Sequence, residues 1–207
     1  MSKKILGLAV GLLVVVSVVR ADEAQRVVKL TDLAGKAHTP LSQPEYKATV
    51  LFFLLPDCPI SNAYAPEIKR IAVEYAKKEV ATFIVYVDPD LSADDARKHA
   101  IEFGYEYPVL RDTRLELVKQ TGVTIAPETV VFGPNGELRY RGRIDDLYAD
   151  YGKRRAQPLQ RDLRDALDAV LAERPVTRER TTAIGYHITD QPERASVRFS
   201  TNTLTGR

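Results

Sequence analysis

Residues 50–66 read Val-Leu-Phe-Phe-Leu-Leu-Pro-Asp-Cys-Pro-Ile-Ser-Asn-Ala-Tyr-Ala-Pro. The continuously apolar run at 50–55 is typical of a central strand that is covered on both faces. From residue 64 to residue 75, apolar residues recur with helical spacing. Between the two patterns lies Cys58, the only cysteine of the 207-residue chain. We therefore expect Cys58 at the N-terminus of a helix, where unpaired N–H groups and the helix dipole favour a thiolate.

Pro66 falls in the second turn of this predicted helix. A proline inside a helix removes a hydrogen bond and kinks the axis, at a cost of about 3 kcal/mol or more. Two interpretations are open: a kinked helix that starts at Cys58, which we favour, or a helix that starts only near Pro66.

The rest of the chain alternates between strand and helix patterns. Strand patterns cover 26–30, 81–87, 107–110, 128–132 and 137–141, and helix patterns cover 92–104, 113–121 and 159–171. Gly133-Pro-Asn-Gly136 separates the last two strands and predicts an antiparallel hairpin. The alternation before it predicts βαβ units around a parallel core sheet.

Three landmarks resemble those of thioredoxin-like proteins. Cys58-Pro-Ile-Ser61, followed by Pro66, is similar to that family's Cys-x-x-Cys helix with serine in place of the second cysteine. Residues 122–132 resemble its cis-proline segment, and residues 133–142 resemble its closing hairpin. Over residues 27–172 the chain is similar to exported redoxins of the alkyl hydroperoxide reductase/thiol-specific antioxidant type. The resemblance implies an α/β thioredoxin-like fold with a central mixed sheet flanked by helices, an N-terminal hairpin and an extended C-terminal tail.

The sequence divides into three segments. Residues 1–21 have the basic, apolar and small-residue regions of a signal peptide, and 22–173 form the redoxin-like domain. Residues 174–207 are rich in Thr, Arg and Ser, and we interpret them as an extended or partly disordered tail. We therefore expect an exported protein, periplasmic or secreted, with a membrane anchor as the alternative if the signal segment stays uncleaved.

The resemblance also implies the residues of a site. It places Pro127 beside Cys58 with a cis peptide bond, so that the backbone at Ala126 can pair with an extended substrate. Ser61 cannot resolve a mixed disulfide, but we expect its hydroxyl to donate a hydrogen bond to the Cys58 thiolate. The candidate catalytic residues are Cys58, Ser61 and Pro127, and the candidate substrate-binding residues are Pro59, Asn62, Ala126 and Arg111.

Exposure of this turn decides whether the thiol can react. Because Pro56 ends the strand and Pro59 has no N–H to donate, we expect the turn to face solvent and Cys58 to be reactive. The alternative is an inert buried cysteine, since free cysteines are among the most buried residues. Farther along, Asp145, Asp146 and Tyr148 either line the cleft or belong to a solvated loop, and we favour the loop.

Three functions fit these residues. The favoured one is monothiol thiol–disulfide exchange with a small thiol or with a protein that carries a thiol or disulfide. The second is a thiol peroxidase that needs an external reductant. It is weakened because peroxiredoxins carry a hydroxyl residue where this chain has Leu55, which leaves Arg111 as the one peroxide-binding candidate. The third is a non-catalytic protein-binding module, favoured by the single cysteine and by Phe52 at the position of the thioredoxins' buried acid.

Composition argues against other classes of function. The formal charge is +2 with both signs interspersed, which does not suggest a nucleic-acid surface. One cysteine and three scattered histidines give no metal-ligand spacing. We expect neither a metal nor a cofactor. Some exported redoxins that this chain resembles carry a Gly-Cys pair near the position of Gly185-Tyr186, so that second cysteine is missing here.

Overall fold

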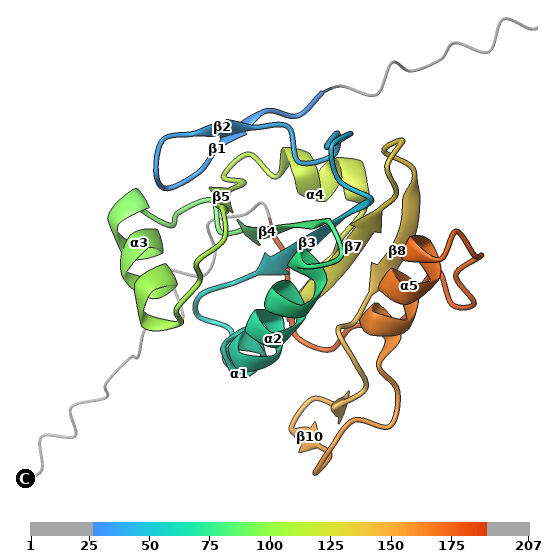
Figure 1. Cartoon of the computed structure of the whole chain (residues 1–207). Coiled ribbons are helices and arrows are strands. Elements are labelled where there is room, and N and C mark those ends of the chain that lie inside the picture. Colours follow the sequence, from blue (N-terminus) through green and yellow to red (C-terminus); the bar gives the residue numbers. More distant parts are fainter. Residues whose placement is uncertain (1–26, 190–207) are drawn as a thin grey trace, which may run out of the picture.

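A five-stranded mixed sheet forms the centre of the computed structural model, which describes residues 27–189 (Figure 1). The predicted signal peptide and the end of the tail lie outside the described residues. The strand order is β5-β4-β3-β7-β8, and β3, β4 and β5 run parallel while β7 is antiparallel to β3 and to β8. The bounds are β3 Ala48–Leu54, β4 Val80–Tyr86, β5 Val109–Arg111, β7 Glu128–Phe132 and β8 Leu138–Gly142.

Five helices flank this sheet within the described residues: α1 Pro59–Ala63, α2 Ala65–Ala76, α3 Ala93–Glu102, α4 Glu116–Thr121 and α5 Asp162–Leu171. Ser92 caps α3, its hydroxyl oxygen accepting the Asp95 N–H at 3.0 Å. Helices α2 and α5 lie side by side on one face of the sheet (Figure 1), and the Tyr75 hydroxyl donates to the carboxylate of Asp168 at 3.0 Å. The predicted mixed sheet flanked by helices is confirmed.

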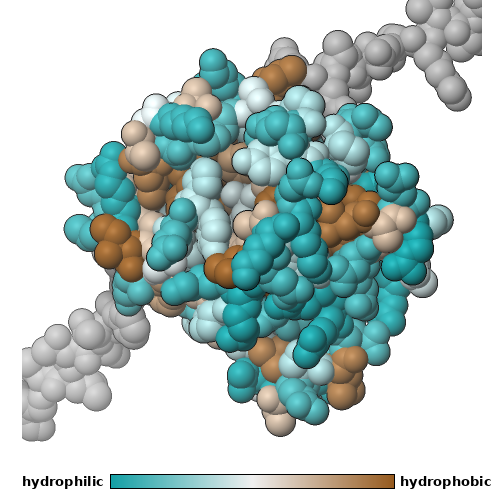
Figure 2. All heavy atoms as spheres, viewed as in Figure 1, coloured by the Kyte–Doolittle hydropathy of each residue, from teal (hydrophilic) through white to brown (hydrophobic). Residues whose placement is uncertain are grey.

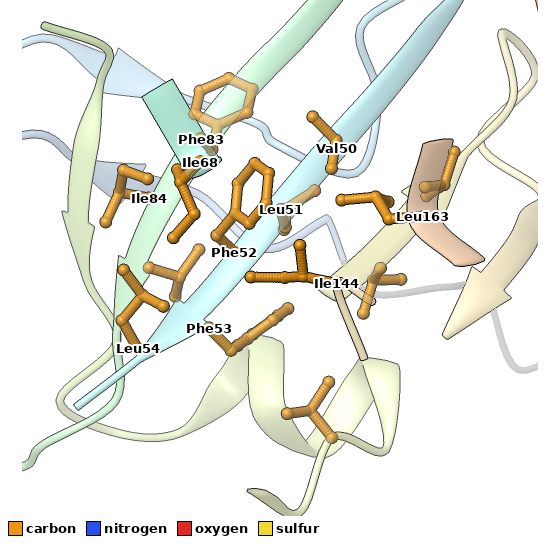
Figure 3. Packing of buried hydrophobic residues seen from close by; sticks show 14 of the residues in the cluster. Val50, Leu51, Phe52, Phe53, Leu54, Ile68, Phe83, Ile84, Ile144 and Leu163 are labelled. Atoms are coloured by element: carbon orange, nitrogen blue, oxygen red, sulfur yellow. The ribbon is translucent and has the colours of Figure 1, made fainter. Parts of the chain in front are cut away.

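Strand β3 supplies the centre of the core because every one of its residues is buried. Figure 3 shows its side chains packing with Ile68 of α2, Ile84 of β4 and Leu163 of α5. Both faces of this strand are therefore covered, which explains the continuous apolar run in its sequence. On the outer surface, hydrophilic residues dominate the face seen in Figure 2, and hydrophobic residues form separate patches.

The helix after Cys58 is interrupted, and neither interpretation of Pro66 is fully right. A short helix does begin at Pro59, as the kinked-helix interpretation required. The helix breaks at Tyr64, which ends α1 and caps the start of α2. Pro66 thus lies in the first turn of a new helix, where its missing N–H needs no acceptor.

Three short strand pairings were harder to predict. The expected N-terminal hairpin is present as β1 Leu30–Thr31 and β2 Ala37–His38. The polar loop contains a second hairpin, β9 Tyr148–Asp150 and β10 Lys153–Arg154, which projects below the sheet in Figure 1. Strand β6 Ile125–Ala126 pairs with β11 Tyr186–His187.

The segment after α5 runs in extended conformation but stays on the domain. The N–H of Arg141 in β8 donates to the Glu179 carbonyl at 2.8 Å, and Val176 and Ala183 are buried. The boundary at residue 173 therefore marks the end of the last helix and its turn, and residues 176–188 pack against the redoxin-like domain.

Replacing Phe52 by alanine tests the assignment of β3 as the centre of the core. Phe52 is fully buried, so we expect Phe52→Ala to lower the free energy of unfolding by about 3–5 kcal/mol in urea titrations. As a control, Val73→Ala truncates an exposed residue of α2 and should change it by no more than about 0.5 kcal/mol. Equal effects of the two substitutions would contradict the assignment.

Candidate active site

Cys58 occupies the N-cap position of α1, with φ −84° and ψ 114°. Its backbone N–H donates to the Leu55 carbonyl at 3.0 Å, which closes the turn after β3. Its own carbonyl accepts the Asn62 N–H at 3.1 Å, the first bond of the helix. Pro59 follows as the first helical residue, so the helix starts directly after the thiol.

The cis-proline segment lies against this turn. The Ala126–Pro127 peptide bond is cis, and the Cys58 thiol donates to the Ala126 carbonyl oxygen at 3.4 Å. The register of the sheet explains the meeting, because Phe53 near the end of β3 is opposite Glu128 at the start of β7. The resemblance placed Pro127 beside Cys58, and the structure does so too.

The expectation of a solvent-facing thiol is wrong for the side chain. Asp57 and Pro59 on either side are exposed, but Cys58 itself has 0% exposure. The turn points its backbone to solvent and its sulfur inward, toward the Ala126 carbonyl. No local pattern in residues 56–61 could have revealed this cover, because it comes from distant segments.

The hydrogen bond that we expected from the Ser61 hydroxyl to Cys58 is not present in the structure. Its hydroxyl oxygen lies 3.5 Å from the Leu55 N–H, and the side chain is buried in the first turn of α1. Among the described residues, Ser61 makes no hydrogen bond to the sulfur of Cys58. Its place in the structure is that of a spacer behind the turn, because its side chain points to the end of β3.

Asn62 holds the turn through a partly buried hydrogen-bond network instead of facing a substrate. Its side-chain amide donates to the Pro56 carbonyl at 2.8 Å, so its oxygen is left to accept from His99 Nε2 at 3.0 Å. The other ring nitrogen of His99 then accepts from the Tyr86 hydroxyl at 2.7 Å. This arrangement needs a neutral imidazole, and burial lowers the pKa of His99 accordingly.

The two aspartates of the polar loop are buried, contrary to the solvated loop that we favoured. Asp145 accepts the Tyr64 hydroxyl at 2.6 Å, and burial raises the pKa of its carboxyl. Asp146 is also buried, but backbone N–H groups of Gln160 and Leu159 outweigh burial and lower its pKa. A cavity of about 10 Å³ is lined by Tyr64, Asp145, Tyr148 and Pro127, among others. Asp145 therefore lies near the cis-proline.

Arg111 is not part of the site. It ends β5 opposite Tyr86, which is itself opposite Leu54, so its backbone lies about two strand spacings, or 10 Å, from the end of β3. Its guanidinium donates to the Leu91 carbonyl. Arg111 therefore ties a neighbouring loop to the sheet, and the only arginine candidate for binding a peroxide is placed elsewhere.

Other kinds of site find no support in residues 27–189. No group of three or more His, Cys, Asp or Glu side chains in this range could hold a metal ion. No helix in it is both long and apolar enough to cross a membrane. What the site contains is one thiol, the backbone of a cis-proline segment and buried polar support.

The Redoxin family profile matches residues 20–151. The chain belongs to the redoxin family. No curated protein matches the sequence of this redoxin. The family explains the thioredoxin-like order of strand, cysteine turn, helix and cis-proline segment.

Solved structures share the fold. A hypothetical protein from Sinorhizobium meliloti superposes with a TM-score of 0.69 at 23% identity, covering 80% of this redoxin and 91% of that chain. An uncharacterized conserved protein from Geobacillus kaustophilus superposes with a TM-score of 0.68 at 28% identity, covering 80% of this redoxin and 90% of that chain. A secreted disulfide oxidoreductase from Mycobacterium tuberculosis superposes with a TM-score of 0.50 at 18% identity, covering 73% of this redoxin and 98% of that chain. The redoxin therefore has the thioredoxin-like fold over most of its length.

The neutral His99 behind the turn predicts a pH dependence of stability. Its folded pKa is below the unfolded value of about 6.5, so the unfolded chain takes up more protons and stability falls as pH drops below about 6.5. Urea unfolding of wild type and His99→Gln between pH 8 and pH 5 measures this effect. We expect the stability advantage of the wild type to shrink toward pH 5, and a constant difference would contradict the neutral histidine.

Proposed function

We propose that this redoxin carries out monothiol thiol–disulfide exchange through Cys58, outside the cytoplasm. The observation that carries the proposal is the placement of the thiol, at the start of α1 and 3.4 Å from the carbonyl oxygen that precedes cis-Pro127. A sulfur electrophile that reaches Cys58 would lie beside the backbone of Ala126. The Mycobacterium tuberculosis protein with the same fold is a disulfide oxidoreductase, which is compatible with this chemistry.

The exchange has two balanced steps. The Cys58 thiolate attacks one sulfur of a disulfide, forms a mixed disulfide with it, and releases the other sulfur as a thiolate that takes up a proton. A second, external thiol then attacks the mixed disulfide, forms a new disulfide with the bound group and returns Cys58 to its thiol form. An external thiol is required because Ser61 stands where a second cysteine would act.

Two observations weigh against peroxidase activity as the main function. Leu55, three residues before Cys58, is buried and has no hydroxyl to bind a peroxide. Arg111 donates to Leu91 and lies away from the thiol. A non-catalytic binding module is the stronger rival, and the full burial of Cys58 is the specific observation that favours it.

Oxidised glutathione is a direct probe of the proposed chemistry. When the reduced protein is incubated with it under native conditions, we expect intact-mass spectrometry to find one added glutathione, on Cys58. Dithiothreitol should remove it, and Cys58→Ser should acquire none. If wild type gains glutathione only after denaturation, the protein is a binding module and the proposal is wrong.

A further inference from the structure

The chain places a strand of its own on the edge of the cis-proline segment. In β11, Tyr186 is the antiparallel partner of Ala126, and His187 is the partner of Ile125. The Ile188 N–H extends the contact by donating to the Thr124 carbonyl at 3.0 Å. Within the described residues, β6 has no ladder partner other than β11. The edge beside the thiol is therefore occupied from within.

Gly185 brings this strand into direct contact with the site. A Cβ atom there would lie 2.0 Å from the Ala126 carbonyl oxygen and 2.9 Å from Pro127 Cδ. The same Ala126 oxygen accepts the Cys58 thiol. Only a residue without a side chain lets the backbone approach so closely, so the fit of the segment depends on this glycine.

An aromatic pair adds to the contacts that β11 makes at the site. The Tyr186 ring stacks on Tyr151, which follows β9, with centroids 6.1 Å apart and an interplanar angle of 11°. The side-chain hydrogen bond with Tyr186 is the largest cause that raises the pKa of Tyr151, to about 12. Tyr151 itself is 57% exposed. Because Tyr186 is the ladder partner of Ala126, which accepts the Cys58 thiol, the pair lies beside the site, with Tyr151 exposed and Tyr186 half-buried.

The segment that contains β11 is attached more weakly than the elements of the core. The ladder between β6 and β11 has two residue pairs, and residues 184–189 are only partly buried or exposed. Ala183, just before them, is buried and marks where firm packing ends. Short, exposed pairings open locally at a much smaller free-energy cost than global unfolding. This segment can therefore leave β6 while the sheet remains intact.

We propose that the segment 185–188 is an internal cover that occupies the substrate edge of β6, and that Cys58 reacts only when this segment leaves. The inference rests on the proposed thiol chemistry and adds its regulation. An extended polypeptide that carries a disulfide would compete with the segment for the backbone groups of β6, which are the groups that β11 now uses.

The rate of Cys58 alkylation by iodoacetamide under native conditions tests the cover without requiring any redox activity. The glycine's backbone conformation suits any residue, so Gly185→Ala acts through its clash with Ala126. We expect it to raise the alkylation rate about tenfold, because overpacking favours the open state. The control is Gly35→Ala in the β1–β2 turn, where the added Cβ meets open space but the φ of +88° strains the backbone. It reports what general destabilisation does to alkylation, and its rate should equal that of wild type.

Tyr151→Ala is a second test variant that keeps the test valid if Gly185→Ala does not fold. It removes an exposed ring and also weakens the attachment of the cover. Wild-type alkylation rates in both Gly185→Ala and Tyr151→Ala would overturn the internal cover. Uptake of glutathione separates the two proposals. Uptake at equal rates in wild type and Gly185→Ala overturns the cover and leaves the thiol chemistry standing. Faster alkylation without uptake supports the cover and overturns the chemistry.

Discussion

The antiparallel pairing of β3 with β7 is the constraint on which the site depends. It sets Phe53 opposite Glu128, and so brings the turn after one strand against the cis-proline before the other. Cys58 and Ala126 are 68 positions apart in the sequence, yet the sulfur and the carbonyl oxygen lie 3.4 Å apart. The buried core around β3 stabilises this register, because a shift by one residue would turn core side chains to the opposite face.

The residues that support the turn and the residues that cover the thiol come from different parts of the chain. Behind the turn, Asn62 and His99 fix the Pro56 carbonyl through partly buried hydrogen bonds. In front, β11 and the Tyr151–Tyr186 pair lie over the cis-proline edge. A supported turn and a lightly attached cover suit the proposed exchange, in which the thiol is held in place and an extended polypeptide reaches it. Burial of Cys58 and reactivity of Cys58 are thus compatible.

Apolar periodicity and turn residues predicted the sheet and most helices, because both act locally. The two landmarks of the site, the cysteine turn and the cis-proline, came from the resemblance to thioredoxin-like proteins. Sequence-based prediction failed where contacts between distant segments determine the burial or the position of a side chain. Burial of Cys58 depends on residues far along the chain, and Asp145 is buried through its bond to Tyr64 although its loop looks solvated. Arg111 has a suitable side chain, but its strand lies on the wrong side of β4. Pairing partners of two-residue strands such as β6 and β11 have no sequence pattern to predict them.

The most direct test of the central claim is hydrogen exchange of the Ile188 amide, which donates to Thr124 in the covered site. It should be measured in the reduced protein and again after a cysteine-containing extended peptide has been coupled to Cys58 as a mixed disulfide. The account predicts that coupling removes the protection of Ile188 while the amides of β3 stay protected. Unchanged protection of Ile188 in the coupled protein would show that the partner and β11 do not share an edge, and would contradict the account.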